Sequence, residues 1–166
     1  MKKLLLSLAL ILVCQFSFGR DLSDITRQFA SKPNAQYMLI PQDMLKMFVG
    51  QILNKTDVSK YNVSKEDINH VIERIDSVAY MSLDDCSDEV KGDFNKKISD
   101  ISSCGYDKIE EINGTGAIFK KEKNGNTTEI VAFITKDNNY DLVRFFGNIK
   151  PEEVQALLGK VSNLKF

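Results

Sequence analysis

The sequence is poor in the residues from which most active sites are built. Its 166 residues include three cysteines and one histidine, His70, which has no cysteine or second histidine nearby. A zinc site or a histidine-activated nucleophile needs such neighbours. The sequence also has no Gly-rich phosphate loop and no Gly-x-Ser-x-Gly elbow. We therefore predict no catalytic residues, no metal and no cofactor, and we expect His70 to be an ordinary helix residue.

The sequence also lacks an excess of charge of either sign. Lysine and arginine together number 22 and the acidic residues 23, for a formal net charge of −1. The basic residues form no stripe or cluster, which the neutralisation of nucleic-acid phosphates requires. A nucleic acid is therefore not an expected partner. With 43% hydrophobic residues, however, the chain can form a buried core.

Past the N-terminus, no apolar run approaches the roughly 20 residues that cross a bilayer. The first 19 residues have the three parts of a secretory signal: Lys2 and Lys3, an apolar run over 4–16, and the small-x-small site Ser17-Phe18-Gly19. We predict a signal peptide over residues 1–19, cleaved between Gly19 and Arg20. The mature protein is then periplasmic or secreted.

A lipid anchor on Cys14 is the competing interpretation of this leader. A lipoprotein signal has a small residue just before its cysteine, whereas Leu12 and Val13 precede Cys14, so we favour simple cleavage. The leader carries two of the basic residues and no acidic residue, so residues 20–166 carry a net charge of −3. Their length suits a single globular domain over 20–166.

Hydrophobic periodicity and turn residues outline the secondary structure of that domain. Helices are expected over 22–30, from Pro41, from Ser64 (an N-cap), over 87–103 and from Pro151. Strands are expected over 37–40, 78–83, 117–123, 127–135 and 140–149, with a polar linker over 54–62. This order predicts an α+β fold: a two-layer sandwich with helices packed on one face of a mostly antiparallel sheet of about five strands.

Cys86 and Cys104 are the two cysteines of the mature chain, and export would favour a disulfide between them. A continuous helix over 87–103 places them about 27 Å apart, because each residue rises about 1.5 Å. A disulfide needs Cα atoms within about 7 Å. We therefore predict that both are unpaired, unless Gly92 breaks the helix.

The C-terminal strands give a prediction of register and of a contact surface. A two-residue turn at Asn124-Gly125 pairs Lys120 with Glu129, Phe119 with Ile130 and Ile118 with Val131. A second turn at Asn138-Asn139 pairs Lys136 with Asp141, Ala132 with Phe145, Phe133 with Arg144 and Val131 with Phe146.

In this register one face is the side assigned to the helices, and it collects Ala117, Phe119, Ile130, Ala132, Ile134, Val143 and Phe145. The other face is too apolar for solvent, although Arg144 interrupts it. We predict it as a binding interface centred on Phe133, Arg144 and Phe146, since aromatic residues and arginine are enriched at such contacts. The alternatives are that a loop such as 54–62 covers this face, or that the two faces are reversed.

Several segments resemble one family of exported proteins from Gram-negative bacteria, in their order and spacing rather than in any single motif. These segments are 36–41, 75–78, 105–109, 129–131 and above all Tyr140-Asp141-Leu142-Val143-Arg144-Phe145-Phe146-Gly147-Asn148-Ile149. The chain resembles the domain of unknown function numbered 4252 over roughly residues 36–160. The resemblance implies an envelope or stress-response setting, and it implies no chemistry and no site residues.

We therefore expect a non-enzymatic envelope protein that acts by binding a protein, a peptide or a second copy of itself. The first alternative is a periplasmic protein that binds a small ligand between its helices and its sheet. A hydrolase is a weaker alternative, because the sequence offers no nucleophile–base pair.

Overall fold

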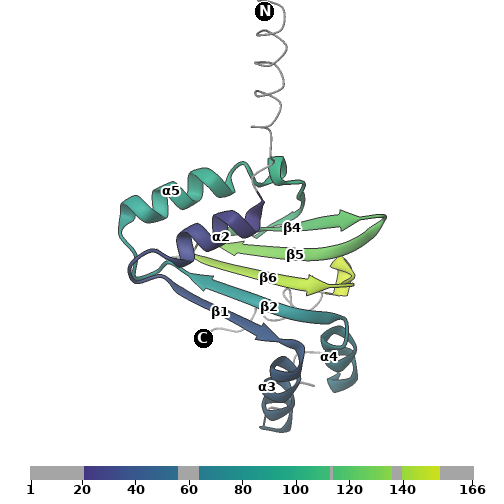
Figure 1. The fold of residues 1–166 in the computed structure, drawn as a ribbon. Coiled ribbons are helices and arrows are strands. Elements are labelled where there is room, and N and C mark those ends of the chain that lie inside the picture. Colours follow the sequence, from purple (N-terminus) through teal and green to yellow (C-terminus); the bar gives the residue numbers. More distant parts are fainter. Residues whose placement is uncertain (1–20, 56–63, 113, 136–139, 154–166) are drawn as a thin grey trace, which may run out of the picture.

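The computed structural model describes residues 21–55, 64–112, 114–135 and 140–153. Within these residues the chain forms one antiparallel sheet of six strands in the order β1-β2-β6-β5-β4-β3 (Figure 1). The strands are β1 (Gln36–Pro41), β2 (Ile75–Ser82), β3 (Asp107–Glu111), β4 (Gly116–Lys123), β5 (Asn126–Ile134) and β6 (Asp141–Gly147). The predicted α+β sandwich is confirmed, with six strands where about five were expected, and with helices on part of the second face as well as on the first.

Three of the helices begin where a short polar side chain caps their first turn. They are α2 (Leu22–Ala30), α3 (Gln42–Lys55), α4 (Lys65–Ile72), α5 (Asp88–Ile98) and the short 3₁₀ helix η2 (Ile101–Cys104). Asp21 accepts from the backbone N–H of Ser23 at the start of α2. Ser64, the predicted N-cap, forms a reciprocal capping box with Asp67 at the start of α4.

The region after α5 differs from the prediction. The helix ends at Ile98 rather than Ser103, and the chain turns into η2, which Gly105 closes in the left-handed conformation at φ 80°. The strand β3 that follows was missed. It carries a single apolar residue, Ile109, among charged ones, so no alternating pattern marks it.

Helices α2 and α5 cover one face of the sheet (Figure 1). Phe29 of α2 meets Phe94 of α5 edge-on, with ring centroids 5.0 Å apart, and Phe94 meets Phe133 of β5 in the same way at 5.5 Å. Leu22, Met81 and Leu142 are fully buried beside them. The main core therefore lies between these two helices and the central strands.

Helices α3 and α4 cover part of the opposite face, at one end of the sheet (Figure 1). Val71 and Ile72 of α4 form a second buried cluster with Val78, Ile118 and Ile130 of the sheet. Leu45 and Val49 of α3 pack against this cluster as half-buried residues. The other side of α3 stays exposed.

The β4–β5 hairpin turns at Asn124-Gly125 as predicted, with φ of 55° and 78°, as a type I′ turn requires. A bulge between Lys121 and Glu122 then shifts the register by one residue. The predicted pairs are therefore wrong, and the pairs observed are Lys121 with Glu129, Lys120 with Ile130, Phe119 with Val131 and Ile118 with Ala132.

The predicted β5–β6 register is wrong by two residues. The pairs observed are Val131 with Arg144, Ala132 with Val143, Phe133 with Leu142 and Ile134 with Asp141. A shift of two keeps each side chain on its face, whereas the one-residue bulge in β4–β5 moves Phe119 to the face of Val131 and Phe133. Lys136 and the second predicted turn lie outside the described residues.

Gly147 ends β6 in a conformation that other residues avoid, at φ 144°. A Cβ atom there would collide with the backbone carbonyl oxygen of Arg74, just before β2. A glycine is therefore required at position 147, because the backbone there lies close to the segment that joins α4 to β2.

Three further predictions fall wholly or mainly outside the described residues: the signal peptide over 1–19, the linker over 54–62, and the last helix beyond residue 153. The first residues of that helix, 151–153, are helical as expected from Pro151. Among the described residues no helix is both long enough and apolar enough to cross a membrane.

Candidate functional site

Phe133 and Arg144 lie in the interior of the molecule. Phe133 packs against Phe94 beneath α5, and Arg144 is 4% exposed beneath α2. The prediction that their face is open is wrong, because α2 and α5 cover it. The alternative that the two faces are reversed describes the structure better. Phe146 is half-buried at the end of the same face.

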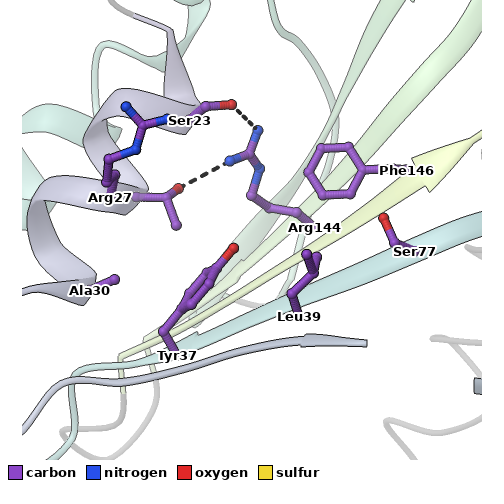
Figure 2. Close-up of a pocket in the computed structure, with 9 residues that line it drawn as sticks. Ser23, Arg27, Ala30, Tyr37, Leu39, Ser77, Arg144 and Phe146 are labelled. Atoms are coloured by element: carbon purple, nitrogen blue, oxygen red, sulfur yellow. Dashed lines mark hydrogen bonds between the residues drawn. The ribbon is translucent and has the colours of Figure 1, made fainter. Parts of the chain in front are cut away.

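Arg144 is the centre of a buried polar network. Its Nε donates to Oε1 of Glu129 at 2.6 Å, and Tyr106 donates from its hydroxyl to Oε2 of the same carboxylate at 2.6 Å. The Nη1 and Nη2 groups of Arg144 donate to the hydroxyls of Thr26 and Ser23 on α2, at 3.2 and 3.1 Å (Figure 2). Thr26 in turn donates to the carbonyl oxygen of Leu22. The network thus joins β5, β6 and the start of β3 to α2.

Within the network Arg144 stays protonated and charged, and Tyr106 stays protonated and neutral. Burial raises the pKa of Tyr106, and its hydrogen bond to Glu129 raises it further. Burial lowers the pKa of Arg144, but the hydrogen bond and the negative charge of Glu129 outweigh this effect, so the pKa of Arg144 is raised. No buried side-chain nitrogen or oxygen atom of the described residues lacks a hydrogen-bond partner. Such a satisfied network holds a fold together.

An open pocket lies beside this network, between α2 and strands β1, β2 and β6. It has a volume of about 480 Å³, and its lining includes Ala30, Tyr37, Leu39, Arg144 and Phe146. Figure 2 shows Tyr37 and Leu39 standing on β1 on the same side as Arg144. The guanidinium of Arg144 lies 4.8 Å from the centre of the Phe146 ring and forms the inner wall. The outer side of the pocket is the edge strand β1.

Strand β1 is an edge of the sheet with unusually apolar, exposed side chains. Among the described strands its neighbour is β2 alone. Tyr37, Met38 and Leu39 are 48%, 48% and 55% exposed. Tyr37 and Leu39 lie on the face of α2 and Met38 on the opposite face, because successive side chains of a strand alternate. Both sides of this edge are therefore apolar and open.

The exposed apolar surface continues into α3, which follows β1 directly. Met44, Met47 and Phe48 are 42%, 52% and 41% exposed. Their spacing of three and four residues places them on one side of the helix, away from Leu45 and Val49, which pack on the sheet. We call Tyr37, Met38, Leu39, Met44, Met47 and Phe48 the β1–α3 surface.

Comparison with protein families gives one match. Residues 29–157 match the family described as a domain of unknown function (DUF4252). The chain belongs to this family. The match includes β1, the pocket and the network, except for the first turns of α2. Neither the curated proteins nor the solved structures contain a match.

The other residues considered from the sequence are not part of the β1–α3 surface. The Nε2 atom of His70 is 3.0 Å from Nη2 of Arg74 and 4.0 Å from a carboxylate oxygen of Glu153, at the end of α4. His70 is thus an exposed helix residue within a small charged group. Within the described ranges, no three His, Cys, Asp or Glu side chains are grouped so as to hold a metal ion.

Cys86 and Cys104 are both free thiols in the structure. Cys86 is buried and its Sγ donates to the carbonyl oxygen of Pro33 at 3.4 Å, and burial raises the pKa of its thiol. The argument from a continuous helix is wrong, since α5 ends at Ile98. The absence of a disulfide stays a prediction.

Sequence reasoning missed both the network and the open edge. Glu129 and Arg144 share a face in the predicted register as well, but that register placed Arg144 opposite Phe133, four residues from Glu129. In the structure Arg144 pairs with Val131, two residues from Glu129. The signal for the edge was present in the sequence: no charged residue occurs between Lys32 and Asp43, although edge strands usually carry charges.

Proposed function

We propose that this protein is an exported, non-enzymatic binding module that takes an extended segment of polypeptide onto β1. In this mode of recognition the added strand pairs its backbone with the open edge, and its alternate side chains enter pockets beside it. The backbone pairing provides affinity and the pockets provide specificity. Here the pocket beneath α2, with Tyr37 and Leu39 on its outer side, would receive side chains on one face.

The observation that carries this proposal is the apolar, exposed edge of β1. Soluble proteins protect their edge strands with charges, bulges or coverings, because an open edge pairs with other chains. The opposite edge of this sheet follows that rule: β3 carries Asp107, Lys108, Glu110 and Glu111. Strand β1 has no charged residue and no bulge in its pairing with β2 between Gln36 and Pro41.

A binding role also agrees with the way in which the buried polar side chains are hydrogen-bonded. Arg144, Glu129 and Tyr106 are used in holding α2 against the sheet. General acid–base catalysis needs a titratable group within hydrogen-bond reach of the substrate, and neither Glu129 nor Tyr106 is among the residues that line the pocket. This supports a protein that binds rather than one that reacts.

Selection of peptides from a random phage-displayed library tests the proposal. Peptides selected on the immobilised chain are synthesised, and their affinities are measured by fluorescence anisotropy. We expect Leu39→Lys to weaken their binding at least about tenfold, a loss of about 1.4 kcal/mol, because a charge on the edge opposes strand addition. Leu39→Val, which keeps the strand apolar, and Glu111→Lys on β3 serve as matched controls and should bind normally. Equal binding by the Leu39→Lys variant would contradict the proposal.

The export part of the proposal has its own test. The intact mass of the protein recovered from the periplasm should correspond to a chain that begins at Arg20. A mass that includes a diacylglycerol group on Cys14 would show a lipid anchor instead.

A second candidate function is the binding of a small ligand in the pocket. The residues that line its inner wall favour this function. Arg144 presents a buried guanidinium beside the Phe146 ring, with the hydroxyls of Ser23 and Thr26 alongside. An aromatic carboxylate suits this combination of charge and ring. Benzoate and its neutral analogue benzamide test it by calorimetry: binding of benzoate alone supports the candidate, and binding of neither compound excludes it.

A further inference from the structure

The uncharged character of β1 extends beyond the strand itself. From Pro33 to Gln42 the chain carries no charge, and Lys32 and Asp43 flank this stretch. A strand that pairs with it gains nothing from charged side chains and loses their hydration. The segment that fits best is therefore uncharged, extended and apolar on both faces. Strand β1 is itself such a segment.

Building on the proposed function, we propose that the strand added to β1 is β1 of a second copy of this chain. Two copies related by a two-fold axis through the sheet would pair these strands antiparallel, and the two sheets would join into one. Every copy presents the same open edge, so both edges are covered at once. The β3 edges would stay at the two outer ends of the joined sheet, with their charges in solvent.

The faces of the strands restrict the register of this pair. Side chains directly opposite each other in an antiparallel pair lie on the same face, so the axis must pass beside one residue, Met38 or Leu39 at the middle of the strand. Pro41 has no N–H to donate to a neighbouring strand. An axis at Met38 pairs residues Gln36–Ile40 of one copy with the same residues of the second copy, and it leaves Pro41 outside the ladder. We therefore assign the axis to Met38.

With the axis at Met38, the exposed residues of β1 cover one another. Tyr37 faces Leu39 of the second copy on the side of α2, and the two Met38 side chains meet on the opposite side. Tyr37 and Leu39 line the pocket of each copy, so the two pockets would meet across the axis. A single cleft, with an Arg144 near each end, would result.

Helix α3 adds the surface that a strand alone lacks. Stable interfaces bury roughly 800 Å² on each partner, which exceeds what one short strand offers. Met44, Met47 and Phe48 stand just beyond the C-terminal end of β1. In the antiparallel pair this end lies beside the N-terminal end of the partner's β1, so both α3 helices flank the shared strands.

Cysteine cross-linking tests the proposed register directly. In the Met38→Cys variant the two new thiols lie directly opposite each other, with Cα atoms about 4.5–5.5 Å apart, which a disulfide spans. In Leu39→Cys, the matched control, the two thiols are offset by two residues along the strands, because position 39 of one copy lies opposite Tyr37 of the other. We expect Met38→Cys to form a covalent dimer at least about tenfold faster than Leu39→Cys, because pairing raises the effective concentration of its thiols. Faster cross-linking of Leu39→Cys would overturn the register.

Introducing opposite charges at position 38 tests whether a second copy of the chain is the partner. Sedimentation of the unmodified chain should give twice the chain mass, and Met38→Lys and Met38→Glu should each give single chains, since two like charges would meet on the axis. An equimolar mixture of the two variants should restore the double mass. A single chain at all concentrations, with no cross-link at position 38, would overturn the second copy as partner. The proposed function would still stand if selected peptides bind and Leu39→Lys weakens them.

Discussion

Two regions on the α2 side of the sheet differ in how they use polar and apolar residues. Beneath α2, Arg144, Glu129 and Tyr106 are buried and bonded to one another. Two strands further out, on β1, Tyr37 and Leu39 are about half exposed. The residues with reactive chemistry are thus inside and engaged, and the unreactive ones are outside and available. In this protein the network is expected to control stability, and the edge to control association.

The largest expected effect on stability comes from removing Glu129. In Glu129→Ala the guanidinium of Arg144 stays buried without its charged partner, and we expect a loss of about 3–5 kcal/mol of unfolding free energy, as for other broken buried pairs. Urea denaturation measures this loss. Glu129→Gln, which keeps the shape and one acceptor, should lose less. A loss below about 1 kcal/mol in Glu129→Ala would mean that the network is dispensable and would break the comparison.

The double variant Glu129→Leu/Arg144→Met sharpens the same point. With both charges removed, no unpaired charge remains buried, so the double variant should be more stable than Glu129→Ala. Its loss should be smaller than the sum of the two single losses, because the residues act together. Additive losses would show that Arg144 and Glu129 contribute separately.

A smaller effect is expected from Tyr106→Phe. The variant leaves Oε2 of Glu129 without its donor, at a cost of about 1–3 kcal/mol. Because the pKa of Tyr106 is raised in the folded state, its contribution is complete below the unfolded pKa of about 10. Above that pH the unfolded chain loses a proton that the folded chain keeps, so stability falls by about 1.4 kcal/mol per pH unit. The difference in unfolding free energy between wild type and Tyr106→Phe should therefore shrink from pH 10 to pH 11. A constant difference would contradict this role of Tyr106.

The smallest effect on stability is expected at the edge. Leu39→Lys replaces a side chain that is 55% exposed, and exposed changes of this kind usually alter stability by no more than about 0.5 kcal/mol. Thermal unfolding of the chain at low concentration measures this, with Leu39→Val as the control. A large loss at low concentration would mean that Leu39 belongs to the core, and the edge would no longer differ from the network.

The sequence predicted the elements whose residues show a clear period or cap. The stripe Leu22, Ile25 and Phe29 predicted α2 with the observed bounds, and Ser64 with Asp67 predicted the start of α4. The Asn-Gly turn of the β4–β5 hairpin was equally clear. In these cases the signal is local, and local signals can be read from one sequence.

What failed depends on interactions between distant residues. The bulge near Lys121 has no mark in the sequence, yet it changes which residues of β4 share a face with Phe133. Arg144 was expected at a surface because the face without central charges was assigned to the helices. The predicted register placed Glu129 on the same face as Arg144 but too far along the strands for the two to pair. The sequence therefore predicted the side chains of Phe133, Arg144 and Phe146 to face a binding partner instead of the helices, and it did not predict the β1–α3 surface.

The order of the strands also has a consequence for how the chain folds. Strand β6 is the last strand in the described sequence, but it lies in the middle of the sheet, between β2 and β5. Its pairing with β2 joins residues as far apart as Ile75 and Gly147, 72 positions along the chain. Closing such a long loop is slow compared with forming a hairpin. Until β6 is in place, β2 has β1 alone beside it, and the two halves of the sheet are separate. Pairing of β6 with β2 is therefore the step that joins the β1–β2 pair and the strands β3, β4 and β5 into one cooperative domain.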